Sequence, residues 1–174
     1  GSFVSPKWTP QMERIDEIVS KFNPRPGVKY TALALNARGI ERARQYSPPL
    51  TLEENAIPRI SCHMCDVFVR RNANRSQAVE MEQWPQIIAQ AQELQVQEAG
   101  IGTNASWGSN FLGEFSVDNL MTMLHKQHDL WNQAGIKVTS VALGDPMSWC
   151  MPDKVEDTII RIKDEWPQVD HFSL

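Results

Sequence analysis

Apolar and polar positions along the chain follow two alternating patterns. Continuous apolar runs predict buried strands at residues 30–35, 60–64 and 138–143, with a weaker glycine-containing strand at 98–104. Between them, apolar positions at helical spacing predict helices at about residues 12–22, 38–46, 79–94, 117–131 and 155–166. A further strand is expected to begin at His171.

Residues suited to helix starts support these boundaries. We expect N-terminal caps at Thr9, Ser76 and Ser116, and a capping box at Asp153 and Glu156. Pro85 lies inside the third helical segment and predicts a kink or two shorter helices, because proline removes a backbone donor.

Repeated strand–helix units predict an α/β fold with a parallel sheet covered on both faces. Strands begin near residues 2, 29, 58, 98, 137 and 170. No G-x-G-x-x-G follows the first strand and no Gly-Lys-Ser or Gly-Lys-Thr phosphate loop occurs, which weighs against a nucleotide-binding doubly wound sheet. The alternative is a (β/α)8 TIM barrel, which typically needs about 250 residues. The 174 residues would then be part of one.

Polar residues gather where the predicted strands end. They are Ser2, Ser5, Lys7, Asn36, Arg38, His63, Asp66, Thr103, Asn104 and Asp145. In a parallel barrel these ends converge on one mouth, which is where barrel enzymes carry out chemistry.

Composition narrows the function classes. The length fits one domain with its own core, and a net charge of −4 argues against nucleic-acid partners and a membrane surface. No apolar run approaches the roughly 18 residues of a membrane span, and residues 1–7 lack the pattern of a signal peptide.

Three cysteines are too few for a disulfide scaffold, so we expect a cytoplasmic or organelle-matrix protein. Cys62 and Cys65 have CxxC spacing but lack the second ligand pair of a zinc site.

Several segments resemble the 3-hydroxy-3-methylglutaryl-CoA lyase family, in the same order along nearly the whole chain. They are Phe-Val-Ser-Pro-Lys-Trp-Thr-Pro-Gln-Met at 3–12, Asn-Ala-Arg-Gly at 36–39, Arg-Arg-Asn at 70–72 with Ser76, Gly108 and Gly113, and Leu-Gly-Asp at 143–145. The resemblance runs from the end of the family's second strand to the start of its seventh.

This resemblance implies a partial TIM-barrel lyase domain over residues 1–174, acting with divalent magnesium or manganese. Such lyases cleave a carbon–carbon bond in a 3-hydroxy-acyl-CoA, and they are commonly homodimers. The family's metal ligands and its catalytic Arg-Asp pair correspond to none of the 174 residues, so no metal ligand is predicted here. Pro146 and the Ala-Ser-Trp-Gly segment at 105–108 depart from the family pattern, which leaves the substrate open.

The resemblance and the strand-end positions together give the candidate site residues. Asp145 is the catalytic candidate, and the substrate-binding candidates are Ser2, Asn36, His63, Arg71, Asn72 and Asn104. Arg71 would contact phosphates of the acyl-CoA, and His63 would act as an acid or base, although the family has no histidine there. Each candidate also has a structural alternative, such as the capping of a turn by Asp145.

Two other functions stay open at this point. One is a Claisen-type acyltransferase that condenses acetyl-CoA with a 2-keto acid. The other is a catalytically silent barrel that acts as a binding protein. The segment at 3–12 favours the lyase.

Overall fold

The computed structural model describes residues 2–7, 9–34, 37–51 and 57–174. The chain divides into two compact units, Gly1–Ala56 and Ile57–Leu174. The candidate Asn36 lies outside the described residues.

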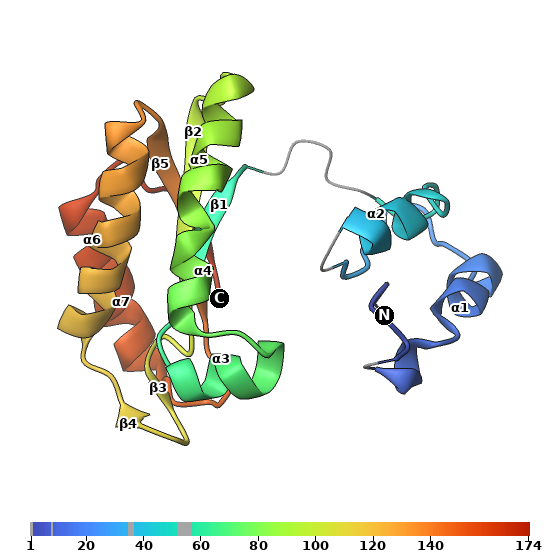
Figure 1. The fold of residues 1–174 in the computed structure, drawn as a ribbon, viewed down its shortest axis with the longest axis horizontal. Coiled ribbons are helices and arrows are strands. Elements are labelled where there is room, and N and C mark those ends of the chain that lie inside the picture. The colour runs from blue at the N-terminus through green and yellow to red at the C-terminus, as the bar shows by residue number, and fades with distance from the viewer. Residues whose placement is uncertain (1, 8, 35–36, 52–56) are drawn as a thin grey trace. The chain divides into compact units, whose positions relative to one another are not determined.

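The second unit is built on a parallel sheet whose strands follow chain order. The sheet runs β1-β2-β5-β6, with β1 at Arg59–His63, β2 at Glu98–Asn104, β5 at Lys137–Gly144 and β6 at His171–Ser173. Its helices are α3 (Asp66–Ala73), α4 (Gln77–Glu82), α5 (Trp84–Glu93), α6 (Val117–Gln133) and α7 (Pro152–Glu165). They alternate with the strands and pack around the sheet (Figure 1). A short hairpin of β3 (Gly108–Ser109) and β4 (Gly113–Glu114) follows β2. This α/β order is that of part of a (β/α)8 barrel, as predicted.

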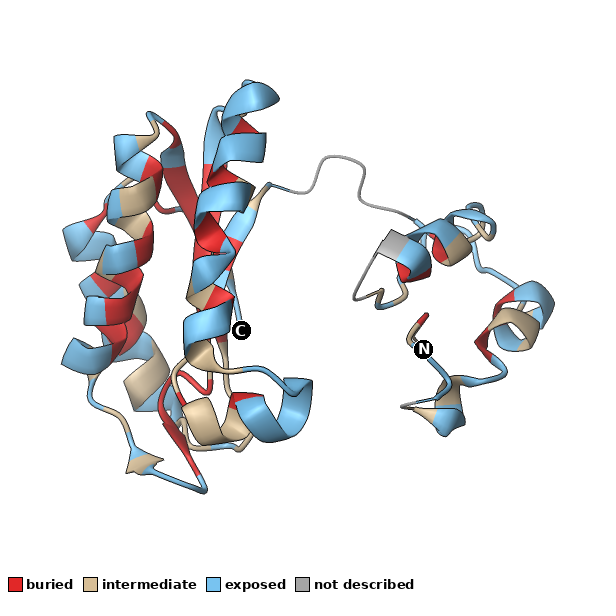
Figure 2. Cartoon of the chain, viewed as in Figure 1, coloured by how far each residue is buried: buried red, intermediate tan, exposed pale blue. Residues whose placement is uncertain are grey.

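A single apolar core joins the strands to the helices of this unit. Ile60, Ile101 and Val141 from three adjacent strands are fully buried, and Trp131 and Ile162 from α6 and α7 pack into the same cluster. Five consecutive residues of β2 are buried (Figure 2), so this central strand is covered on both faces.

Helix starts and breaks in this unit largely follow the sequence. The hydroxyl oxygens of Ser76 and Ser116 accept hydrogen bonds from the backbone N–H groups of Val79 and Asn119, as expected of N-caps. The helical segment that contains Pro85 is divided into α4 and α5, so that this proline lies in the first turn of α5.

The predicted capping box at Asp153 and Glu156 is wrong. Helix α7 begins at Pro152, so its cap residue is Met151, two residues before Asp153, and Met151 makes no side-chain cap bond. Proline is favoured in the first turn of a helix, and this moves the start ahead of Asp153.

The first unit holds a short 3-10 helix at Pro10–Met12, α1 at Ile15–Lys21 and α2 at Ala37–Arg44. A small cluster that includes Phe3, Ile15 and Leu50 forms its core. The predicted helix at 38–46 is confirmed by α2.

Two expectations for the first unit are wrong. Thr9 makes no side-chain cap bond, because Pro10 opens a 3-10 turn and the α-helix begins only at Ile15. The described part of the predicted strand at 30–35 forms only isolated parallel bridges, Ser2 to Leu33 and Tyr30 to Leu50. Leu33, which forms one of these bridges, is 56% exposed, so no neighbouring layer covers its side chain.

No helix among the described residues combines the length and the apolar composition needed to cross a membrane.

Candidate functional site

The carboxyl ends of three adjacent strands carry polar residues that lie together. His63 ends β1, Asn104 ends β2, and Asp145 follows Gly144 at the end of β5. The ladders pair His63 with Asn104 and Asn104 with Gly144. The sequence prediction that these strand ends converge is thereby confirmed for the second unit.

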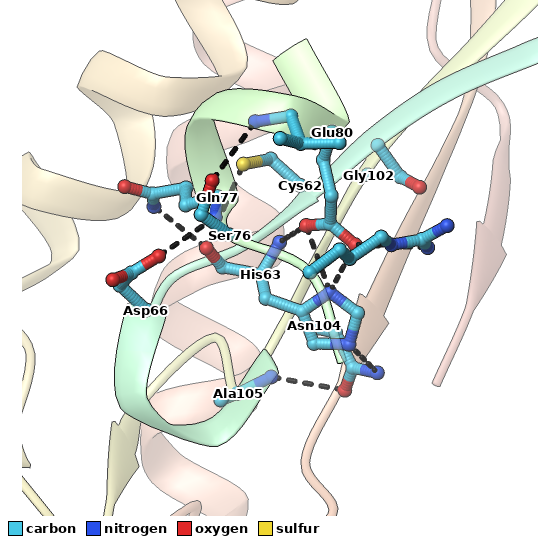
Figure 3. Close-up of polar contacts among 12 residues, drawn as sticks. Cys62, His63, Asp66, Ser76, Gln77, Glu80, Gly102, Asn104 and Ala105 are labelled. Carbon is cyan, nitrogen blue, oxygen red and sulfur yellow. Dashed lines mark hydrogen bonds and ion pairs between the residues drawn. The ribbon is translucent and has the colours of Figure 1, made fainter. Parts of the chain in front are cut away.

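Hydrogen bonds link the ring of His63 to Glu80 on one side and to Asn104 on the other (Figure 3). The ring atom Nδ1 lies 2.9 Å from Oε1 of Glu80, and the ring atom Nε2 lies 3.2 Å from Nδ2 of Asn104. The backbone N–H of Ala105 donates to Oδ1 of Asn104 at 3.0 Å, which assigns the amide orientation. Nδ2 of Asn104 is therefore the donor to Nε2, and the proton of His63 lies on Nδ1.

Glu80 is a buried carboxylate that receives several donors at once. It is 6% exposed, and its oxygens accept from the backbone N–H and the ring Nδ1 of His63 and from the guanidinium of Arg75. Burial alone would raise the pKa of Glu80, but the hydrogen bonds from His63, together with the charge of Arg75, outweigh it and hold that pKa below its usual value. The carboxylate is therefore ionised at neutral pH.

Sequence reasoning missed Glu80, although a signal was present. Glu80, Trp84, Ile88 and Ala91 recur at helical spacing, and all four are buried. A carboxylate on an otherwise apolar helix face needs a charged or hydrogen-bonding partner, so its position predicts a buried polar contact.

The backbone at the end of β1 is fixed by a second set of bonds. Gln77 donates its side-chain N–H to the carbonyl of His63 at 2.6 Å, and its own backbone N–H donates to Asp66 at 2.7 Å. Asp66 also accepts from Arg70 at 2.6 Å. Helices α3 and α4 thus hold the strand end from which the His63 ring projects.

Asp145 is engaged by the loop that follows it. Oδ1 accepts from the backbone N–H of Trp149 at 3.0 Å, and Oδ2 accepts from that of Cys150 at 2.8 Å. These bonds order the connection between β5 and α7, as expected if Asp145 caps the turn that follows it. They also orient a half-buried carboxylate at the same sheet edge as Asn104.

Two further candidates of the second unit take no part in the hydrogen bonds described above. Arg71 and Asn72 are exposed near the end of α3, and the guanidinium of Arg71 stands 4.8 Å from the ring centroid of Phe111. Ser2 lies in the first unit, at its bridge to Leu33.

The same unit contains a separate polar cavity of about 370 Å³. Its lining comes from the loop after Ser2 and from α2, and it comprises Phe3, Val4, Ser5, Pro6, Lys7, Arg38, Gly39 and Arg42. The lining includes Ser5, Lys7 and Arg38, three of the polar residues that were predicted to lie at strand ends.

Two cysteine thiols of the second unit, those of Cys62 and Cys150, have a pKa above the usual value. Burial, with a smaller effect of the charge of Glu80, raises the pKa of the Cys62 thiol to about 12. Burial and the nearby Asp145 also raise the pKa of Cys150. Among the described residues, no three His, Cys, Asp or Glu side chains gather in a way that could hold a metal ion.

Comparisons with known proteins point to one family. No protein-family model matches the chain. It is 36% identical over 100 residues to a 3-hydroxy-3-isohexenylglutaryl-CoA/hydroxymethylglutaryl-CoA lyase of Pseudomonas aeruginosa. The matched segment covers 58% of this chain and 31% of that protein. It is 27% identical over 154 residues to the hydroxymethylglutaryl-CoA lyase of Pseudomonas mevalonii, covering 88% of this chain and 46% of that one.

The fold agrees with these sequence matches. A crystal structure of hydroxymethylglutaryl-CoA lyase from Pseudomonas aeruginosa superposes with a TM-score of 0.59 at 25% identity, covering 98% of this chain and 53% of that one. The chain thus spans less than half of the two curated relatives and about half of the solved structure. In sequence and in fold, it resembles the hydroxymethylglutaryl-CoA lyases, as part of a TIM barrel.

Proposed function

We propose that the whole protein is a carbon–carbon bond lyase that acts on a 3-hydroxy-acyl-CoA of the hydroxymethylglutaryl-CoA type. The observation that carries this proposal is the meeting of His63, Asn104 and Asp145 at the carboxyl ends of three adjacent parallel strands. Barrel enzymes place their chemistry at this edge. The likeness to hydroxymethylglutaryl-CoA lyases supplies the reaction class.

In this proposal each side chain has a role that suits its surroundings. Asp145 acts on the reacting part of the substrate, because its carboxylate is held in one orientation by two backbone donors. His63 and Asn104 contact polar atoms of the acyl group. For Ser2 and Asn36, a contact with the substrate is proposed from the sequence alone. Arg71 and Asn72 contact the coenzyme A portion, whose phosphates favour an exposed guanidinium.

A divalent cation, magnesium or manganese, belongs to the proposal for the whole protein. When bound, it would polarise the hydroxyl and carboxylate oxygens of the substrate. The described residues do not bring together a set of ligands that fits such an ion. No role given above to a residue depends on the cation. A homodimer and a cytoplasmic or organelle-matrix location complete the proposal.

The test is turnover of hydroxymethylglutaryl-CoA by the complete protein, with and without magnesium or manganese. Asp145→Asn should lower kcat about 100-fold, in line with the contribution of a positioned acid or base. It should lower the free energy of unfolding by only about 1–2 kcal/mol, since one backbone N–H loses its acceptor. Asp153→Asn is the matched control, because Asp153 is exposed in the first turn of α7.

Equal losses of folding and of activity in Asp145→Asn would assign this carboxylate to the loop alone. Condensation of acetyl-CoA with a 2-keto acid, in place of cleavage, would replace the lyase proposal with the acyltransferase.

A further inference from the structure

Glu80 is the carboxylate on which the polar contacts at the end of β1 converge. Oε2 accepts from the backbone N–H of His63 at 3.0 Å, while Oε1 lies 2.9 Å from the ring Nδ1 and 3.0 Å from the guanidinium of Arg75. Arg75 is 43% exposed, whereas the side chain of His63 is only 14% exposed. Pairing with the exposed Arg75 does not require a buried carboxylate. The contact of Glu80 with the His63 ring therefore indicates a second role for this carboxylate.

The hydrogen bonds run in one direction through the site. The N–H of Ala105 donates to Asn104, the amide of Asn104 donates to Nε2 of His63, and Nδ1 of His63 donates to Glu80. A free neutral imidazole can carry its proton on either nitrogen. Here the carboxylate selects Nδ1, and that choice leaves the Nε2 lone pair free to accept from Asn104. Glu80 thus supports, through His63, the same amide orientation that the N–H of Ala105 favours at Oδ1.

Asn104 lies in a space that the neighbouring strand leaves open for it. A Cβ atom at Gly144 would come within 2.5 Å of Oδ1 and 3.1 Å of Cγ of Asn104. His63 therefore holds the amide on one side. On the other side, the amide fits only because Gly144 has no side chain. In the described part of the chain, the second N–H of Nδ2 has no hydrogen-bond partner.

We propose that Glu80 is a positioning residue: it fixes His63 as the Nδ1–H tautomer, so that His63 holds Asn104 with its second N–H available to an oxygen of the substrate. This inference rests on the proposed function for the identity of that substrate, a 3-hydroxy-acyl-CoA. An amide N–H suits a hydroxyl, carbonyl or carboxylate oxygen, and it adds no charge to the site. Nothing in the resemblance assigns a role to Glu80, and the family has no histidine at the position of His63.

The test uses the complete protein and the variant Glu80→Gln. An amide in place of the carboxylate must turn one N–H group toward the donors of His63 or Arg75, so it cannot satisfy all of them. Long-range nitrogen–proton correlation spectra at about pH 8.5, where model imidazoles are neutral, report which ring nitrogen carries the proton. The wild-type protein should show His63 with its proton on Nδ1, and Glu80→Gln should shift it toward Nε2.

Glu82→Gln is the matched control, since it makes the same change at an exposed position of the same helix. It should leave the His63 signals and the kinetics unchanged. Glu80→Gln should lower kcat/KM for hydroxymethylglutaryl-CoA about tenfold, the lower end of the effect of an orienting partner.

A wild-type spectrum with the proton on Nε2 would overturn the proposal, and this arm does not need the variant to fold. An unchanged kcat/KM in a folded Glu80→Gln whose tautomer has shifted would also overturn it. If the wild-type protein does not turn over the substrate, the lyase proposal fails and with it the substrate contact of Asn104. The spectra then still decide whether Glu80 fixes the ring.

Discussion

Gly102 lies in the middle of β2, where the sheet leaves no room for a side chain. A Cβ atom built there would come within 2.6 Å of the backbone carbonyl oxygen of Ala142 on β5 and 3.3 Å from its Cβ. Contact with a backbone atom of a paired strand cannot be relieved by a rotamer change. Gly102→Ala should therefore force β2 and β5 apart at the residues that lead to Asn104 and Gly144.

The expected magnitude follows from two opposing effects. Alanine reduces the freedom of the unfolded chain and stabilises by about 0.5–1 kcal/mol relative to glycine. Overpacking a tight core costs about 1–3 kcal/mol, and the rigid backbone places this site at the upper end. The net loss in the free energy of unfolding should be about 2 kcal/mol.

Gly100 provides a matched control two residues earlier on the same strand. Its added Cβ would meet Oγ of Ser140 at 2.5 Å and Nε of Arg59 at 2.8 Å, both of which are side-chain atoms. Among the described residues, Oγ of Ser140 is the buried side-chain atom without a hydrogen-bond partner, so its rotation breaks no bond. Gly100→Ala should change stability by less than about 1 kcal/mol.

Urea unfolding followed by tryptophan fluorescence measures this difference. Five of the six tryptophans lie after residue 57, so the signal reports mainly on the second unit. If Gly102→Ala proved as stable as Gly100→Ala, the close pairing of β2 with β5 at this position would be refuted.

Three further predictions concern the site. Gly144→Ala should displace the Asn104 amide from His63, since the new Cβ would lie 2.5 Å from Oδ1; the His63 ring signals should shift in nitrogen spectra, and unchanged signals would contradict the geometry. Arg71→Ala should raise KM for an acyl-CoA about threefold to tenfold without a change in kcat, and an unchanged KM would remove the phosphate contact. The pKa of Glu80 is lowered in the folded state, so its stabilisation is present above the ordinary value of 4.5 and is lost as the pH falls through the lower folded pKa. The free energy of unfolding should therefore drop on acidification below about pH 4.5 in wild-type protein, and the drop should be smaller in Glu80→Gln.

The sheet and helices of the second unit were largely predictable from local signals. The continuous apolar run at 138–143 predicted the core of β5, because a strand buried on both faces is apolar at successive positions, and the weaker glycine-containing strand at 98–104 was predicted with its observed bounds. The caps at Ser76 and Ser116 were also predictable, since a serine directly before an apolar helical pattern favours an N-cap. In both cases the cause lies within a few residues of the effect.

Only the part of the site that comes from the ends of the strands was predictable from the sequence. The meeting of His63 with Asn104 follows from parallel pairing of β1 with β2. The partner Glu80 comes from a helix 17 residues further along, and its contact depends on how α4 packs on β1. The isolated bridges in place of a strand after Tyr30 likewise depend on which neighbours cover Leu33, and an apolar run by itself does not specify those neighbours.

The central claim is that the complete protein cleaves a 3-hydroxy-acyl-CoA, and the most direct measurement is product identification by mass spectrometry. Purified protein would be incubated with hydroxymethylglutaryl-CoA and magnesium or manganese. We predict a shorter acyl-CoA and a keto acid in equal amounts, with formation greatly reduced in Asp145→Asn. Intact substrate after incubation with folded, metal-supplied wild-type protein would contradict the account.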